Sequence, residues 1–311
     1  MAVDRADDSD PPRHVDDRDD EDLDSRSAPG AEQVILTDPE LRAAEARRYH
    51  ALADRSRTPA GDSWAAAIPK LRAAWEEHLE RYPEQERVVP GTRPDGSWGT
   101  GTDRMLTAER NAEASQVCEE IRQQGKEVIF PAMKRIEAAD PRRYLAGLEH
   151  MLKGEDRLKE KAAERLRYHP DMTVAQAITE VPDAVRFTLA YSENRYTQGV
   201  RDDVERLKAE GFELIKLKNL WAKDQYKGIN SQWRDRDSGL LIETQFHTQT
   251  SFEAKELTHQ AYERIRAPAT SKEEELLLEN YQRVATARVP VPPDVFEIED
   301  YPPEKRDGWR D

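Results

Sequence analysis

The stretch Leu240-Leu-Ile-Glu-Thr-Gln-Phe-His-Thr248 alternates between two kinds of side chain and therefore predicts a β-strand. Successive side chains of a strand point to opposite faces of its sheet. One face then carries Leu241, Glu243, Gln245 and His247, and the other carries Leu240, Ile242, Thr244 and Phe246. The second face suits a core, whereas the first offers a carboxylate, an amide and an imidazole.

The segments upstream and downstream extend this strand into a sheet. Further strands are predicted over 185–189, 212–217 and 226–234, with a hairpin turn over 235–239. Helices are predicted over 199–210, closed by Gly211, and over 251–266. This order predicts an α+β fold, in which a mixed sheet of about four to five strands is flanked by helices.

The other predicted strands also have a polar face. If these faces coincide, one sheet surface carries Arg186, Tyr226, Asn230, Glu243, Gln245 and His247. Ordinary solvent exposure of one side of an antiparallel sheet is the alternative interpretation. A cation, an aromatic ring and a carboxylate on one surface are also the groups that hold a nucleotide, its phosphates and Mg²⁺.

Lysines near these strands favour an anionic ligand. Lys153 and Lys161 lie on either side of a helix start at Gly154, and a second group consists of Lys216, Lys218, Lys223 and Lys227. A local basic cluster is informative in a chain of net charge −15. Solvated surface lysines are the alternative. The sequence contains no Walker loop, no GxGxxG and no HExxH motif.

The remainder of the chain divides into a leader, a helical region and a tail. The first 40 residues hold 14 acidic and 4 basic side chains, so we expect a disordered acidic leader over 1–36. The alternative is an acidic mimic that occupies a basic groove. A helical region is expected over 37–140, with a Pro/Gly linker at 83–102, then the sheet-containing domain over 141–290 and an extended tail over 291–311.

Within these regions the apolar spacing predicts individual helices. They cover 37–52, 64–82, 106–123 with a break near Gly125, 140–152 from an Asp140-Pro141 start, 155–168 and 173–178, and a last helix begins after Ser271. A single cysteine, Cys118, excludes internal disulfides. Because no apolar run could span a bilayer and no signal core is present, we expect a cytoplasmic protein without a membrane partner, or one exported as a toxin without a cleaved signal peptide.

Three segments together resemble a known family. Asp183-Ala-Val-Arg-Phe-Thr188, Gln225-Tyr-Lys-Gly-Ile-Asn230 and Ile242-Glu-Thr-Gln-Phe-His-Thr248 resemble, in order and spacing, the synthetase domain of RelA/SpoT-type alarmone synthetases. They are most similar to its small actinobacterial branch, which is related to toxin C-termini. The resemblance covers about residues 142–266, and the segment Gly147–Lys161 is similar to the basic loop of that family.

The resemblance implies a nucleotidyltransferase-like fold and a Mg²⁺-dependent transfer of pyrophosphate from ATP to the 3′-hydroxyl of a purine nucleotide (GTP/GDP or ATP/ADP), as in stress signalling. It implies that Lys153, Lys161 and Arg186 hold ATP and that Asp183 and Glu243 hold Mg²⁺, with Glu243 also the base. The implied acceptor site consists of Tyr226, Lys227, Asn230, Gln245 and His247, with Tyr226 stacked on the base.

Some positions depart from the family pattern. Met151 stands where an arginine is usual, Arg157 where a serine is usual, and His247 where an arginine is usual. In a register like that of the long bifunctional enzymes, Val181 would occupy the metal position instead of Asp183. Two alternatives to synthesis of (p)ppGpp or (p)ppApp therefore stay open: a nucleotide-binding module without transfer, and a toxin that pyrophosphorylates the tRNA 3′ end. The near-neutral body argues against a large nucleic-acid footprint.

Overall fold

A five-stranded mixed sheet lies at the centre of the computed structural model, which describes residues 59–303 except 84–89, 100–103 and 268. In spatial order its strands are β4 (Arg143–Ala146), β5 (Arg186–Tyr191), β8 (Leu241–Thr248), β7 (Ile229–Asp235) and β6 (Phe212–Asn219). β5 and β8 run parallel, and the other neighbours are antiparallel. The predicted α+β fold is confirmed, as are the four predicted strands, to within a few residues at their ends.

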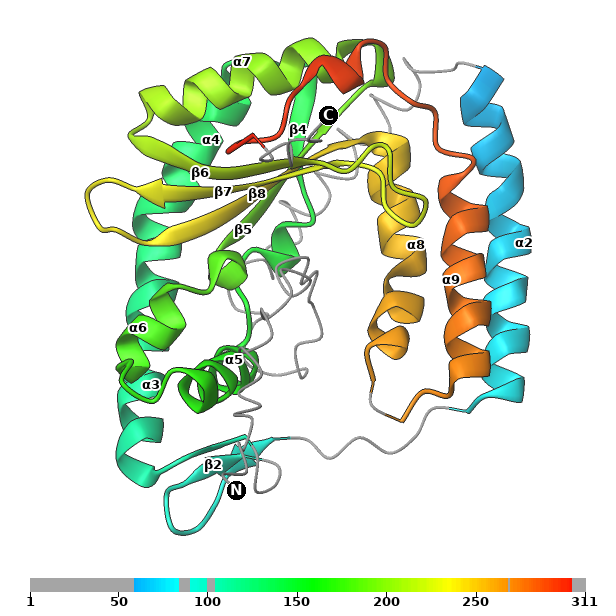
Figure 1. Ribbon diagram of the computed structural model, residues 1–311. Helices are drawn as coiled ribbons and strands as arrows, with labels where there is room; N and C mark the ends of the chain where they lie inside the picture. The colour runs from blue at the N-terminus through cyan, green and yellow to red at the C-terminus, as the bar shows by residue number, and fades with distance from the viewer. Residues whose placement is uncertain (1–58, 84–89, 100–103, 268, 304–311) are drawn as a thin grey trace, which may run out of the picture.

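The apolar face of the sheet is covered by α4 (Phe130–Ala138) and α7 (Tyr196–Ala209) (Figure 1). In contrast, α3 (Ala108–Gln124) continues away from the sheet and packs against α5 (Glu155–Tyr168) and α6 (Val174–Thr179). Phe187 of β5 stacks on Phe130 of α4 with ring centroids 6.4 Å apart. The Tyr196 hydroxyl of α7 donates a hydrogen bond to the Phe246 carbonyl at 2.7 Å. This face is therefore sealed, and it is part of one hydrophobic cluster that runs from Trp64 to Val295.

The opposite face lies toward α5 and α8 (Gln249–Ile265). α8 packs beside α9 (Lys272–Thr286) and α2 (Pro59–Arg81), so the three helices form a layer to one side of the sheet (Figure 1). The Trp75 indole N–H of α2 donates to Gln260 of α8 at 2.9 Å. This arrangement leaves the polar face of the sheet between α5 and α8.

Turn and cap residues act where the sequence predicts. Ser271 accepts a hydrogen bond from the Glu274 backbone at the start of α9, and Thr173 caps the short α6. Gly211 and Gly239 have φ of 98° and 75°, a region that a residue with a Cβ rarely adopts. One cap differs: Thr248, not Ser251, begins α8 by accepting from the Ser251 N–H at 3.0 Å.

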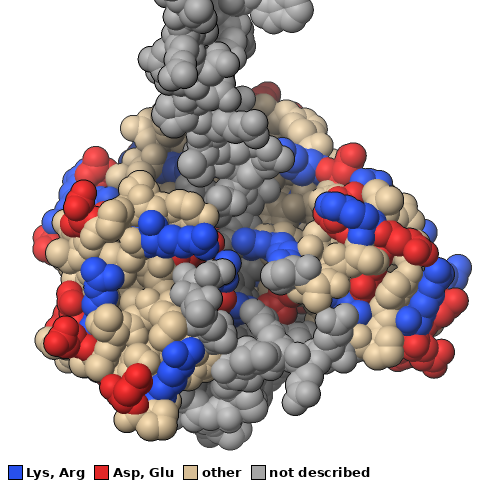
Figure 2. Space-filling view, turned by 60° about the horizontal axis from the view of Figure 1, so that its bottom comes forward, with Lys and Arg blue, Asp and Glu red and all other residues tan. Residues whose placement is uncertain are grey.

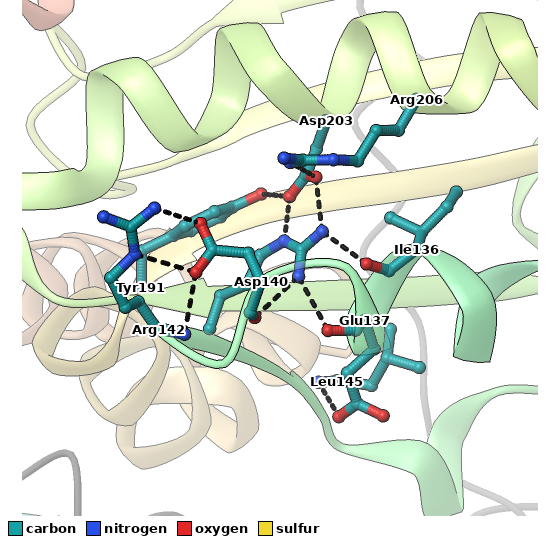
Figure 3. A network of polar contacts seen from close by, with 9 residues as sticks. Ile136, Glu137, Asp140, Arg142, Leu145, Tyr191, Asp203 and Arg206 are labelled. Atoms are coloured by element: carbon teal, nitrogen blue, oxygen red, sulfur yellow. Dashed lines mark hydrogen bonds and ion pairs between the residues drawn. The ribbon is translucent and has the colours of Figure 1, made fainter.

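The predicted helix over 140–152 is wrong. Residues 143–146 form β4, and Leu148–His150 form one 3-10 turn (η3) after Gly147, whose φ is 62°. The reason lies in a buried network around Arg143, which Figure 3 shows. Its guanidinium donates to the Glu137 and Asp140 carbonyls at 2.9 and 3.0 Å and pairs with Asp203 of α7. These bonds hold the segment extended beside β5.

Two other expectations for the helical region are corrected. No break occurs at Gly125, because a π-turn, η2 (Gly125–Ile129), joins α3 to α4. A Cβ on Gly125 would lie 2.8 Å from Leu152, so the glycine serves close packing here. The Pro/Gly linker contains β1 (Gly91–Thr92) and β2 (Trp98–Gly99), which form a small sheet with β3 (Met105–Leu106).

The tail follows the outer strand of the sheet. Leu217 of β6 exchanges two backbone hydrogen bonds with Tyr301, at 2.7 and 2.9 Å, and a 3-10 turn, η6 (Val295–Glu297), interrupts the extended segment. An otherwise unpaired strand edge is thereby covered. The expected leader over 1–36 and the helix over 37–52 lie outside the described residues. No helix in the described ranges has the length and apolar character to cross a bilayer.

Candidate nucleotide site

The register of the sheet brings the predicted polar side chains to one face. Arg186 lies directly beside Glu243 across the parallel β5–β8 pair, and Asn230 lies beside Gln245 across the antiparallel β7–β8 pair. Side chains at paired positions share a face. Arg186, Glu243 and Gln245 are buried and Asn230 is half-buried, so this face is not a freely solvated surface.

Asp183 approaches this floor from η4 (Pro182–Ala184), the turn that enters β5. Its carboxylate forms an ion pair with Lys153 and lies 3.5 Å from the Lys161 ammonium of α5. The Lys153 backbone N–H donates to the Ala184 carbonyl at 3.1 Å, which fixes the basic segment beside the start of β5. The two predicted donor-site lysines therefore meet the predicted metal-site aspartate.

The electrostatics of the two carboxylates differ. Burial alone would raise the pKa of Asp183, but Lys153 and Lys161 outweigh it and hold the pKa below its usual range. Burial raises the pKa of the Glu243 carboxyl, the negative charge of Asp183 raises it further, and Arg186 opposes both. Asp183 is thus a stable anion, while Glu243 has a heightened affinity for a proton.

A hydrogen-bonded chain joins the predicted acceptor residues. The Tyr226 hydroxyl donates to the side-chain oxygen Oδ1 of Asn230 at 2.6 Å and lies 2.8 Å from His247 Nε2. His247 Nδ1 lies 2.9 Å from the Ser251 hydroxyl. Burial lowers the pKa of His247 well below its usual value, and Lys255 and Arg186 lower it further. The neutral ring therefore orients Tyr226 and adds no positive charge.

The close approach of the His247 ring explains why the motif has a glycine at position 228. A Cβ at this position would lie 2.8 Å from Cε1 of the His247 ring. The space taken by the imidazole is available only because residue 228 lacks a side chain. The Tyr226 ring meets the same imidazole edge-on, with centroids 5.3 Å apart.

Lys227 lies apart from this group. Its ammonium donates to the backbone carbonyls of Trp221 and Lys223, and therefore holds the loop before β7. Burial lowers its pKa. The predicted contact of Lys227 with the acceptor stays a prediction. In the structure its ammonium is bound to these two carbonyls instead.

The residues that depart from the family pattern have clear surroundings. Met151 is buried in the core, and its carbonyl accepts from the Arg186 N–H at 2.8 Å. Arg157 pairs with Glu160 at 2.9 Å and with Glu263 of α8 at 3.8 Å. Val181 is fully buried in the hydrophobic cluster, so Asp183 rather than Val181 carries the side chain next to the lysines.

Lys255 belongs to this group of charges and was not predicted. It extends from α8, its side chain is 8% exposed, and its ammonium lies 5.3 Å from the centroid of the Phe252 ring. A signal was present, because Thr248, Phe252 and Lys255 follow each other at helical spacing directly after the strand motif. Figure 2, seen from the side of α5 and α8, shows Lys and Arg side chains on both sides of the centre of this face.

Mg²⁺ fits the oxygen atoms present. Asp183 and Glu243 supply two carboxylates of the same charge whose repulsion a divalent cation would relieve. The Gln245 side-chain carbonyl is buried and has no hydrogen-bond partner among the described residues, while its amide donates to Glu243 at 2.9 Å. The described residues contain no group of three or more His, Cys, Asp or Glu side chains that could hold a metal ion.

Comparison with known proteins gives distant structural likenesses. No protein-family model matches this chain, and no curated protein does. A GTP pyrophosphokinase family protein from Streptococcus pneumoniae is 16% identical, with a TM-score of 0.39 over 58% of this chain and 90% of that one. The small alarmone synthetase 1 from Bacillus subtilis is 15% identical, with a TM-score of 0.40 over 57% and 92%. A second structure of the Bacillus protein, bound to its product pppGpp, is 14% identical, with the same TM-score and coverage.

Proposed function

We propose that this chain transfers pyrophosphate from ATP to the 3′-hydroxyl of a purine nucleotide. The observation that supports the proposal best is the meeting of Arg186, Asp183 and Glu243 on one buried face, with Lys153 and Lys161 beside them. Three cations gathered at this face favour an anionic ligand. Two of the three motifs that resemble the alarmone synthetases carry Asp183, Arg186 and Glu243, and the segment similar to the basic loop of that family carries the two lysines.

The lysines and Arg186 are arranged to hold a triphosphate. Phosphoryl transfer requires positioning of two substrates and neutralisation of charge on the transferred group, more than covalent chemistry by the protein. Lys153 and Lys161 contact Asp183 from two directions, and the charge of Arg186 acts on both Asp183 and Glu243. Mg²⁺ held by Asp183 and Glu243 would neutralise further negative charge on the phosphates.

Glu243 is the base in this proposal. The acceptor 3′-oxygen forms a bond to the β-phosphorus of ATP, and the bond from that phosphorus to the oxygen bridging to the α-phosphate breaks. AMP leaves, and the hydroxyl proton passes to the Glu243 carboxylate. Burial raises the pKa of Glu243 toward the working range of a general base.

A nucleotide-binding module without transfer is the second candidate, and Met151 favours it. This position, where the family usually has an arginine, is 2% exposed and packed in the core. No guanidinium is therefore available from it to stabilise the transferred group, and loss of one such donor typically costs about 10²–10³-fold in rate.

Radiolabelled ATP, with the label in the transferred group, distinguishes these functions. The full-length protein is incubated with Mg²⁺ and, separately, with GTP, ATP or deacylated tRNA as acceptor. Label on GTP or ATP is the expected result. Label on tRNA alone would replace the nucleotide acceptor with a nucleic acid, and nucleotide binding without any labelled product would leave the binding module as the function.

A further inference from the structure

The C-terminal tail is attached to the end of β6 by side chains as well as by backbone hydrogen bonds. The Asn219 backbone N–H donates to Asp300 Oδ1 at 2.7 Å, and Oδ2 of the same carboxylate lies 3.2 Å from the Lys218 ammonium. Val295 of the tail is fully buried in the core. The tail therefore has a fixed position at the point where β6 ends and the chain turns toward β7.

The Asn219 side chain joins this tail to the loop over 220–228. Its amide donates to the Val295 and Ile298 carbonyls at 2.8 and 2.9 Å, and its Oδ1 accepts from the Trp221 backbone N–H at 3.3 Å. A carboxamide has two donor hydrogens and one acceptor oxygen, and all three are used here. The two hydrogens hold the tail, and the oxygen holds the loop.

The loop continues these hydrogen bonds to its other end. Trp221 is 1% exposed, and its backbone carbonyl accepts from the Lys227 ammonium at 2.9 Å. The Leu220 N–H donates to the Gly228 carbonyl at 3.0 Å, which closes the loop at its base. Because Lys227 and Gly228 directly follow Tyr226, both bonds restrict the backbone that carries the Tyr226 ring.

Asn219 acts from the face of the sheet opposite to the polar side chains. It pairs with Ile229 across the β6–β7 ladder, and Ile229 pairs with Phe246 of β8, so these three residues share the apolar face. Asn230 and Gln245, which neighbour them along the strands, lie on the polar face. An effect of Asn219 on a nucleotide at the polar face therefore has to pass through the loop.

We propose that Asn219 is a positioning residue for the acceptor nucleotide, because it fixes the loop that presents Tyr226. This inference rests on the proposed function, since it takes Tyr226 as the residue that stacks on the acceptor base. Asn230 and His247 hold the hydroxyl end of Tyr226 and the loop holds its backbone, so the ring has one orientation before a nucleotide binds. A group that is ordered in advance loses no affinity to its own ordering.

Steady-state kinetics of the full-length protein, with GTP as the acceptor and each substrate varied in turn, test the proposal. Asn219→Ala removes the carboxamide and should raise the KM for GTP about five- to twentyfold, while the KM for ATP stays within about twofold. A variant that is merely less folded has a lower kcat and unchanged KM values, so the kinetics distinguish positioning from a purely structural role. Hydrogen exchange over 220–228 should become faster in the same variant.

Arg201→Met is the matched control. It removes the ion pair between α7 and Glu297 of the tail, at 2.9 Å, which is a tether of the tail that does not involve the loop. Both KM values should therefore stay within about twofold of the wild type. Circular dichroism and melting temperature verify that each variant is folded.

A double variant tests the route through the loop. Lys227→Met removes the bonds to the Trp221 and Lys223 carbonyls and should also raise the KM for GTP. Because both side chains hold the same loop, combining Asn219→Ala with Lys227→Met should raise this KM little beyond the larger single effect. Effects that multiply would mean that the two side chains act independently, and would overturn the route through the loop.

The outcomes separate this inference from the proposed function. An unchanged KM for GTP in Asn219→Ala, an equal rise for both substrates, or faster exchange of the loop without weaker GTP binding would each overturn the positioning role. If the wild type transfers no label, equilibrium binding of GTP takes the place of its KM. Weaker GTP binding in Asn219→Ala than in Arg201→Met would then leave the positioning role standing while the proposed reaction is refuted, and no GTP binding by the wild type would overturn the role itself.

Discussion

Asp203 and Asp183 are both buried carboxylates paired with a buried cation, yet their surroundings differ. In the Asp203–Arg143 pair the side chains are 0% and 1% exposed, and in the Asp183–Lys153 pair each is 3% exposed. Asp203 also accepts from the Tyr191 hydroxyl at 2.7 Å and from Arg206 at 2.6 Å, while Arg143 donates to three backbone carbonyls (Figure 3). Every group of that network has a partner within it.

Around Asp183 several charges meet at one carboxylate. Lys153, Lys161 and Arg186 all act on it, and the pKa of the neighbouring Glu243 is raised. A closed network fixes α4, β4 and α7 together, whereas several cations gathered around one carboxylate are suited to receive an anionic ligand. Burial of an ion pair therefore does not reveal its role. The charged and polar groups that surround the pair do.

The sharpest test of this contrast is Glu243→Gln. We expect transfer to fall by at least about 10³-fold, because the base is lost, while ATP binding persists. The free energy of unfolding at neutral pH should stay the same or rise, since a carboxyl whose folded pKa is raised destabilises the fold when it is ionised. Rate and urea unfolding are measured together, and retained turnover would remove Glu243 from its role.

Asp203→Asn should have the opposite effect: it should lower stability and leave nucleotide binding unchanged. It leaves the Arg143 guanidinium buried beside an uncharged amide, and loss of one member of a buried pair costs about 3–5 kcal/mol. Urea unfolding should reveal this loss, and the nucleotide KM values of the protein that remains folded should match the wild type. A fall in nucleotide affinity without loss of stability would show that the two networks are not separate in function.

Lys153→Met should affect both stability and substrate binding, each to a moderate extent. Asp183 keeps Lys161 at 3.5 Å, so the stability cost should be smaller than that of Asp203→Asn, about 1–2 kcal/mol. The KM for ATP should rise about ten- to a hundredfold, and that for the acceptor much less. Steady-state kinetics with each substrate varied in turn would decide, and an equal rise in both values would count against a donor site at α5.

The smallest expected effect is the pH dependence of the stability that Asp140, in the network around Arg143, contributes. Hydrogen bonds from the Arg142 side chain lower the pKa of Asp140 to about 2. Because the folded pKa is depressed, its stabilisation is complete above the unfolded pKa near 4 and is lost as pH falls toward 2. The stability difference between wild type and Asp140→Asn should therefore shrink from pH 5 to pH 2. A difference that is constant with pH would mean that the carboxylate charge contributes nothing.

Strand periodicity predicted the polar face of each strand, because a period of two fixes which face each side chain takes. Glu243 and Gln245 were assigned to one face of their strand and Arg186 to the polar face of its own, and the register of β5 and β8 brings these faces together. The helix predicted over 140–152 failed for the opposite reason. Leu145, Leu148 and Leu152 follow helical spacing, yet Leu145 enters the core from a strand and Leu148 from a 3-10 turn.

Lys255 and Lys227 show that spacing in the sequence also does not predict where a long side chain points. Both are lysines close in sequence to a motif, and nothing in their spacing reveals which ammonium reaches the polar face. Packing over Phe252 directs Lys255 toward Arg186, while the carbonyls of Trp221 and Lys223 hold Lys227 on a loop. Long side chains take their direction from neighbours that are remote in the chain.

The sequence alone determined the α+β class, the four strands from residue 185 onward, the caps at Ser271 and Thr173, and the shared face of Glu243, Gln245 and His247 within their strand, because all of these depend on local periodicity and turn chemistry. Tertiary structure decided that residues 143–146 become a fifth strand, that Asp183 meets two lysines, and that Lys255 joins them. Those outcomes depend on hydrogen bonds and charges between segments that only the folded chain brings into contact.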